Sequence, residues 1–180
     1  LYKQNIDNQV QRLSLEPQPE KRYPIPTPQI QSLLKHLKPE VVVVSLGTNM
    51  FSLSEQTIIE TSRQLADTIE SSGAKLFWVG APKTGPDPAL LEKLNKVYKA
   101  LKLAFKDKPN VLIDAREYTH YYGSGVIHFS GTKGQAMMEL WSQAVFEHIQ
   151  HGQQKALQNF KMRFEKRIGE NYEKVFAQKN

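Results

Sequence analysis

The chain of 180 residues has the length of one domain, with room for a small appendage but not for two full domains. A hydrophobic content of 39% with 23% charged residues excludes a chain that is disordered throughout. The absence of cysteine excludes a disulfide scaffold, a thiol nucleophile and a cysteine-ligated metal site. No apolar run approaches the ~18 residues of a transmembrane helix, so we expect no transmembrane segment.

The net charge of +6 is concentrated at the carboxyl-terminal end. Residues 151–180 carry seven basic and three acidic side chains, a local net charge of +4. Most of the basic surplus therefore belongs to the last thirty residues.

Residues 1–28 form a proline-rich N-terminal segment that we treat as separate from the folded domain. Five of the ten prolines lie between positions 17 and 28, and each removes a backbone donor and fixes φ. We therefore expect an extended connector there. The helical spacing of Ile30, Leu33, Leu34 and Leu37 then predicts a short amphipathic helix that ends at Lys38 and Pro39.

Residues 29–152 show strands alternating with helices. Apolar, β-branched runs predict strands at 41–46, 75–80 and 110–114. Helical stripes lie between and after them: one follows a capping box at Ser52 and Glu55 and ends near Gly73, one runs over 90–105, and one over about 133–149. This alternation predicts a three-layer α/β/α sandwich with a parallel, flavodoxin-like sheet. Three strands fall short of the usual five or six, so strands are missing from the front of the sheet.

Residues 153–180 form a basic tail with an apolar stripe. Apolar residues recur every three or four positions from Leu157 to Phe176, which predicts one amphipathic helix. Its ordinary role is docking on its own domain or on a neighbouring subunit, so a protein partner or an oligomer contact is one expectation. Membrane or nucleic-acid contact is the alternative, but no nucleic-acid-binding motif supports it, so we do not expect nucleic acid as a partner.

Ligands of open α/β sheets bind beyond the carboxyl ends of the strands, which directs attention to the residues after each strand. Gly47, Thr48 and Asn49 follow the first strand. Asn49 would present an amide donor that can stabilise an oxyanion, while the alternative for the tripeptide is an ordinary Asx-stabilised turn.

His128 lies in a glycine-flanked loop just ahead of the 133–149 helix. A neutral imidazole is the natural general base near pH 7, and loops on rigid scaffolds often carry function. The alternative is a structural histidine that satisfies local hydrogen bonds. The other four histidines have no comparable setting.

Together these residues resemble the SGNH (GDSL-like) hydrolases. The segment VVVVSLGTN at 41–49 is similar to the family's third block, and Gly125 to His128, followed by FSGTKGQAMMELW, is similar to its fifth block. The resemblance implies an ester hydrolase that acts through an acyl-serine, with Gly47 and Asn49 in the oxyanion hole and His128 as general base. It implies no cofactor or metal, a small acyl ester or O-acylated glycan as substrate, and a secreted or bacterial cell-envelope location.

The resemblance does not extend to the first two blocks. Residues 1–28 contain no strand that ends in Gly-Asp-Ser, and Ser14 has neither Gly nor Asp beside it, so the nucleophile is unknown. A fragment, an omission near the proline-rich segment and a degenerate domain are the three explanations. We expect loss from this chain rather than evolution without the strand, because a domain lacking its central strand would expose unpaired backbone.

Gly125 stands where the family has an aspartate that orients the histidine. Asp114, at the end of the third predicted strand, is the candidate replacement. Capping of the following turn or pairing with Arg116 is the alternative that we favour, and a backbone carbonyl that holds His128 is a third. A non-catalytic binding or scaffolding module that uses the basic tail for a partner remains the rival to the hydrolase.

Overall fold

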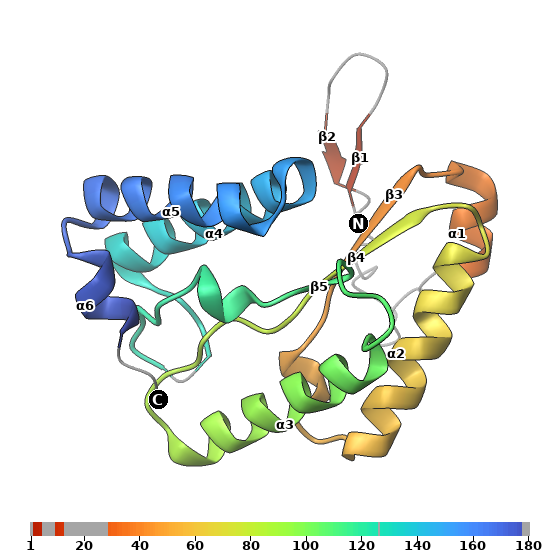
Figure 1. Cartoon of the computed structure of the whole chain (residues 1–180), viewed down its shortest axis with the longest axis horizontal. Helices are drawn as coiled ribbons and strands as arrows, with labels where there is room; N and C mark the ends of the chain where they lie inside the picture. Colours follow the sequence, from red (N-terminus) through yellow and green to blue (C-terminus); the bar gives the residue numbers. More distant parts are fainter. Residues whose placement is uncertain (1, 5–9, 13–28, 126, 178–180) are drawn as a thin grey trace, which may run out of the picture. The chain divides into compact units, whose positions relative to one another are not determined.

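A computed structural model describes residues 2–4, 10–12, 29–125 and 127–177 (Figure 1). The chain divides into two compact units, residues 1–37 and 38–180, which are described separately below. This division falls after Leu37, whereas we placed the domain boundary after residue 28. The expected connector at 17–28 lies outside the described residues, as does Ser14.

The first unit contains a pair of strands and one helix. Strands β1 (Tyr2–Gln4) and β2 (Val10–Arg12) pair antiparallel, with Tyr2 opposite Arg12. We did not predict these strands, because three residues are too few to show a period of two. Helix α1 (Ile30–Leu37) confirms the helix expected from the leucine spacing. Lys38, with a φ of 45°, follows its end.

The second unit is built on a three-stranded parallel sheet, as predicted. Strands β3 (Val41–Ser45), β4 (Lys75–Val79) and β5 (Leu112–Ile113) lie in the order β3-β4-β5. Val41 is opposite Lys75, and Trp78 is opposite Leu112. Each strand is shorter than its apolar run, because the flanking residues turn into loops.

Helices cover both faces of this sheet (Figure 1). Helices α2 (Glu55–Glu70) and α3 (Pro88–Ala104) lie on one side, and α4 (Gly131–His151) and α5 (Gln153–Ile168) lie on the other. Side chains of β4 alternate between these layers: Phe77 and Val79 join the core with α4 and α5, while Trp78 packs against Phe105 at a centroid distance of 5.3 Å. The mixed α/β architecture is therefore confirmed.

The helix ends follow local capping chemistry. Ser54, not Ser52, is the N-cap of α2, and its hydroxyl accepts from the Thr57 N–H at 3.1 Å. Asp87 caps α3 in the same way, with Pro88 at the first helical position, where a missing N–H costs nothing. Our expectation for α2 was wrong by two residues because two serines compete for one cap.

The tail is part of the core of the second unit. It forms two helices, α5 and α6 (Tyr172–Phe176), because Gly169 adopts a left-handed φ of 77° between them. Ala156, Phe160, Phe164 and Ile168 of α5 are buried with residues of β4, β5 and α4. The apolar stripe therefore docks on its own domain. Our expectation of a single long helix was wrong, because the tail forms two helices.

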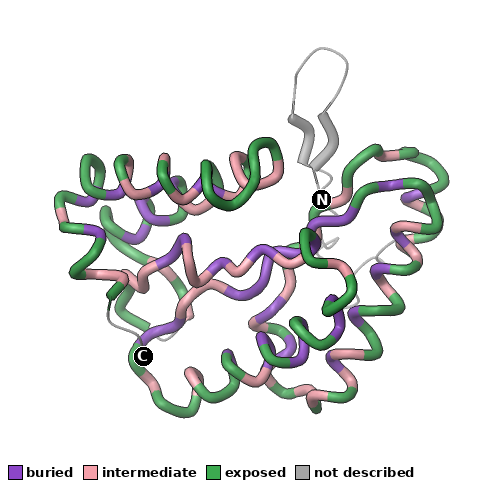
Figure 2. Tube along the Cα trace, in the orientation of Figure 1, coloured by how far each residue is buried: buried purple, intermediate pink, exposed green. Residues whose placement is uncertain are grey.

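Burial differs sharply between neighbouring strands (Figure 2). Four of the five residues of β4 are buried, whereas β3 alternates between exposed and half-buried residues. Val41 is 43% exposed and Val43 is 47% exposed. Within the described residues, β3 pairs on one edge only, with β4.

Across the part of the chain that the structure describes, no helix has both the length and the apolar character needed to cross a bilayer.

Candidate functional site

A cavity of about 300 Å³ opens at the carboxyl ends of β3 and β4, and we call it the His128 cavity. Three loops and one helix surround it: the loops after β3 and β4, the loop that carries His128, and helix α4. Its lining residues are Ser45, Leu46, Gly47, Thr48, Gly80, Ala81, Pro82, Ile127, His128, Phe129, Met138 and Trp141. The tertiary structure therefore brings Gly47 and His128 to one cavity.

Gly47 is held against the next strand's loop at a distance that no side chain allows. A Cβ at this position would lie 2.5 Å from both the Cβ and the backbone N of Ala81. Its φ of 178° is extended backbone, so the requirement is space rather than conformation. Among the described residues the Gly47 N–H has no backbone acceptor outside the helices and strands, and Gly47 is one of the residues that line the cavity.

Asn49 is not brought to the cavity. It lies in the short helix η1 (Thr48–Met50), where its side chain is exposed. The residue that lines the cavity from this turn is Thr48. The η1 turn is closed by the Met50 N–H, which donates to the Gly47 carbonyl at 2.9 Å, so the two expected oxyanion donors are close in sequence but only Gly47 faces the cavity.

His128 is exposed, and its loop is fixed through the backbone. The Tyr121 hydroxyl donates to the His128 carbonyl at 3.2 Å, and the Ser130 N–H donates to the Tyr122 carbonyl at 2.9 Å. A Cβ at Gly123 would lie 2.3 Å from the His128 oxygen, so this close approach requires glycine. Val126, inside the same loop, lies outside the described residues.

Asp114 is paired with Arg116 rather than with His128. Its carboxylate accepts from the Arg116 backbone N–H at 3.1 Å and from Nε and Nη2 of the guanidinium at 2.8 and 2.6 Å. Asp114 thus caps the following turn and pairs with Arg116, the role that we favoured over a catalytic contact with His128. The His128 ring has no hydrogen bond to a carboxylate within the described residues, and Asp114 is absent from the lining of the His128 cavity.

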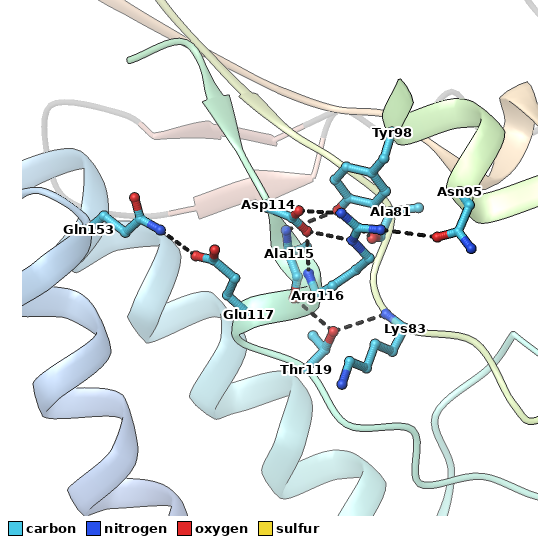
Figure 3. Close-up of polar contacts among 10 residues, drawn as sticks. All are labelled: Ala81, Lys83, Asn95, Tyr98, Asp114, Ala115, Arg116, Glu117, Thr119 and Gln153. Carbon is cyan, nitrogen blue, oxygen red and sulfur yellow. Dashed lines mark hydrogen bonds and ion pairs between the residues drawn. The ribbon is translucent and has the colours of Figure 1, made fainter. Parts of the chain in front are cut away.

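Tyr98 organises the two strand ends that meet here, and sequence patterns alone assigned it to the apolar stripe of α3. Its hydroxyl donates to the Ala81 carbonyl at 2.7 Å and accepts from the Ala115 N–H at 3.0 Å (Figure 3). Burial, followed by the charge of Asp114, raises the pKa of Tyr98 well above its usual value. Tyr98 is therefore a neutral crosslink between the loops after β4 and β5.

Two further residues of the His128 cavity were not predicted. Ser45, the last residue of β3, lines it with an exposed side chain. Trp141 also lines it, and its indole N–H is buried without a hydrogen-bond partner among the described residues. The only available signal was position: Ser45 ends a strand, and Trp141 lies one helical turn beyond Met138.

The donor set does not suit a metal ion. Among the residues that the structure describes, no three His, Asp or Glu side chains are grouped so that they could hold one.

Comparisons of this protein with protein-family models, with curated proteins and with solved structures found no significant match.

Proposed function

We propose that the protein is an ester hydrolase of the SGNH type and that the His128 cavity is its acyl-transfer site. The observation that carries this proposal is the convergence of Gly47 and His128, which are far apart in sequence, on one cavity at the carboxyl edge of the parallel sheet. These are two of the three residues that the sequence motifs singled out. The edge is also where ligands of open α/β sheets bind.

In this mechanism a serine hydroxyl attacks the ester carbonyl, and His128 takes its proton. The carbonyl oxygen becomes an oxyanion that accepts the hydrogen bond of the Gly47 N–H. When the tetrahedral intermediate collapses, the protonated His128 gives its proton to the departing alcohol. Water then attacks the acyl-serine with His128 again as the base, releasing the carboxylic acid and restoring the serine.

The site works without a carboxylate on His128. Asp114 is engaged by Arg116, so the imidazole acts as one half of a serine–histidine dyad. Loss of a carboxylate that orients the histidine leaves slower but real catalysis in serine hydrolases. We therefore expect modest turnover.

The nucleophile would enter beside the edge of β3 that has no partner strand among the described residues. A parallel strand added to this edge would end beside Gly47, because neighbouring parallel strands bring their carboxyl ends together. Such a strand would also cover part of the exposed surface of Val41 and Val43. Ser45 and Thr48 are the hydroxyl side chains that line the cavity within the described residues, and they are the alternatives to an added strand.

The size of the His128 cavity favours a short acyl group. A volume of about 300 Å³ lies at the lower end of the range for small-molecule sites. Leu46, Ile127, Phe129 and Met138 supply apolar walls for the acyl chain. An acetyl ester, free or on a glycan, suits these dimensions.

Hydrolysis of 4-nitrophenyl acetate by the full protein tests the proposal. We expect His128→Ala to lower kcat by about 10²- to 10⁴-fold, the usual contribution of a general base. Asn49→Ala should cost on the order of 10²-fold only if Asn49 turns toward the oxyanion during turnover, as one lost oxyanion donor does. His151→Ala is the matched control, because His151 is exposed and absent from the cavity lining. Unchanged turnover in His128→Ala would contradict the proposal.

Labelling with a fluorophosphonate probe, followed by peptide mapping, identifies the nucleophile. Label on Ser45 or Thr48 would exclude the added strand, and label on another serine that survives Ser45→Ala and Thr48→Ala would support it. The rival binding module predicts neither turnover nor label, and loss of biological activity on removal of residues 153–180. The core packing weighs against this rival, because the tail that it assigns to a partner contributes Phe160 and Phe164 to the protein's own core.

A further inference from the structure

A second, larger cavity lies in the same unit and shares no lining residue with the His128 cavity. It has a volume of about 620 Å³, and we call it the Lys83 cavity. Residues from the loop after β4, from α3, from the short helix η2 (Ala115–Glu117), from α5 and from α6 line it. Its position beyond the carboxyl ends of β4 and β5 is the usual place for a ligand in this architecture, and its size suits a small molecule.

Two charged side chains of its wall have no ion pair among the described residues: Lys83 and Glu117, whose carboxylate accepts from Gln153 at 2.6 Å. Lys83, Arg116 and Lys161 are the basic residues of the lining. Arg116 forms an ion pair with Asp114, and Lys161 forms one with Glu173 at 2.7 Å. No carboxylate of the described residues lies within 4.0 Å of the Lys83 ammonium.

Lys83 is also partly removed from water. Its side chain is half-buried, and its ammonium lies 5.1 Å from the centre of the Phe176 ring. Burial, reinforced by the positive charge of Arg116 and opposed by the negative charge of Asp114, lowers the pKa of Lys83. A desolvated ammonium with no paired anion is an unfavourable arrangement, and a bound anion would relieve it.

The neighbouring residue adds a second unsatisfied polar group. Thr84 also lines the cavity and is 7% exposed. Its Oγ1 is buried and has no hydrogen-bond partner among the described residues. A buried hydroxyl normally has a hydrogen-bond partner, and the described residues supply none for Thr84.

The floor of the cavity is held rigidly (Figure 3). The Lys83 backbone N–H donates to Thr119 Oγ1 at 3.0 Å, and Thr119 Oγ1 donates to the Ala115 carbonyl at 2.7 Å. The Arg116 guanidinium stacks on the Tyr98 ring at 3.7 Å and donates to Asn95 at 3.3 Å. A ligand would therefore meet a preorganised surface, which lowers the cost of binding.

The remaining walls are apolar and aromatic. Leu91 and Leu94 come from α3, Leu157 from α5, and Tyr172 and Phe176 from α6. The last two rings stack with a centroid distance of 4.4 Å and an interplanar angle of 13°. A ligand that fills this space has a flat or branched apolar body attached to its charged group.

We propose that the Lys83 cavity binds small monocarboxylates, with the carboxylate at Lys83 and the apolar body against Leu91, Leu157 and Phe176. A monocarboxylate supplies the one negative charge that Lys83 lacks, and it adds less negative charge beside Asp114 and Glu117 than a phosphate dianion would. The site is separate from the acyl-transfer site and does not depend on the protein being a hydrolase.

Isothermal titration calorimetry of the full chain with sodium benzoate tests this proposal. We expect saturable binding with one site, tighter than that of inorganic phosphate or of uncharged benzamide. Lys83→Met should weaken benzoate binding by on the order of 10- to 100-fold, the value of one hydrogen bond to a charged group, and Lys83→Arg should retain most of the affinity. Lys93→Met is the matched control, since Lys93 is an exposed lysine of α3 outside the cavity.

Two further variants test whether benzoate binds in the Lys83 cavity rather than elsewhere. Leu91→Trp should abolish benzoate binding by filling the cavity while Lys83 stays in place, and far-ultraviolet circular dichroism confirms that each variant is folded. His128→Ala should leave the affinity unchanged. Benzamide binding as tightly as benzoate, equal losses in Lys83→Met and Lys93→Met, no saturable binding of benzoate, or loss in His128→Ala alone would each overturn the proposal.

Discussion

Gly47 shows how a motif residue can be required for packing and for chemistry at once. Its missing side chain allows the loop after β3 to approach Ala81, and this approach closes the His128 cavity on one side. A sequence motif indicates that glycine is present, but it does not distinguish these roles. Here the structure shows the requirement for space, because a Cβ at position 47 would lie 2.5 Å from the Ala81 backbone N.

Gly47→Ala should therefore destabilise the second unit. Overpacking of a fixed backbone contact typically costs about 1–3 kcal/mol, because the loops after β3 and β4 must separate. Urea unfolding followed by tryptophan fluorescence measures the change. Gly125→Ala is the control, since a Cβ there meets nothing nearer than 4.0 Å, and a change within about 0.5 kcal/mol is expected. Equal unfolding free energies for both variants would contradict the packing argument.

Asp114 illustrates the limit of sequence reasoning at a single residue. Its position at the end of a strand was predicted, and so were its two competing partners. The pairing with Arg116 is favoured because the two side chains are two residues apart, so little chain entropy is lost when they meet. A partner fourteen positions away in an irregular loop has no such advantage.

At the scale of elements, the strands and long helices follow from their apolar periodicity. The three parallel strands, α1, α2, α3 and α4 all lie where the patterns predicted them, with ends displaced by at most three residues. The tail was harder, because an apolar stripe shows which face is buried but not against what it packs. The interruption of the helix at Gly169 and the position of α5 in the core are visible only in the tertiary structure.

Phe164→Ala tests the tail as a core element. Phe164 is completely buried and contacts the Phe160, Tyr172 and Phe176 rings at centroid distances of 6.0, 6.0 and 5.3 Å. Its truncation should lower the free energy of unfolding by about 3–5 kcal/mol.

Thermal unfolding of the Phe164→Ala and Met162→Ala variants provides the comparison. Met162 lies on the same helix but is 66% exposed, so its truncation should change stability by less than about 0.5 kcal/mol. If both variants unfold like the parent protein, α5 is a dispensable appendage and the core assignment is wrong.

At the scale of the whole molecule, two partly buried histidines link the stability of the second unit to pH. The buried Tyr118 hydroxyl and His148 Nδ1 share a hydrogen bond of 2.9 Å, and burial lowers the pKa of His148 below its usual 6.5. Burial, aided by the charge of Lys83 and opposed by Glu170, also lowers the pKa of His120. Folding therefore favours the neutral form of both imidazole rings.

The free energy of unfolding should fall as the pH drops below about 6.5, because the unfolded chain then binds protons that the folded chain does not. The stability that these neutral histidines contribute is fully present above their pKa in the unfolded chain. It is lost as the pH falls through their lower pKa in the folded protein. His148→Gln should flatten this dependence, since glutamine does not titrate and its amide can form a hydrogen bond with the Tyr118 hydroxyl in either direction. Urea unfolding at a series of pH values measures the slope.

His151→Gln is the control for this pH dependence, because the His151 side chain is exposed and its replacement should leave the slope unchanged. A slope that is the same in His148→Gln and in the parent protein would show that another group is responsible.

The sequence by itself determined the alternation of strands and helices, the parallel sheet, and two residues, Gly47 and His128, that face one cavity. These features depend on local periodicity and on the rule that parallel strands share a carboxyl edge. Only the tertiary structure decided that Tyr98 crosslinks two loops, that α5 completes the core, and that Lys83 has no counterion among the described residues. Those properties depend on which distant side chains meet, because burial and pairing are set by packing across the fold rather than by neighbours in sequence.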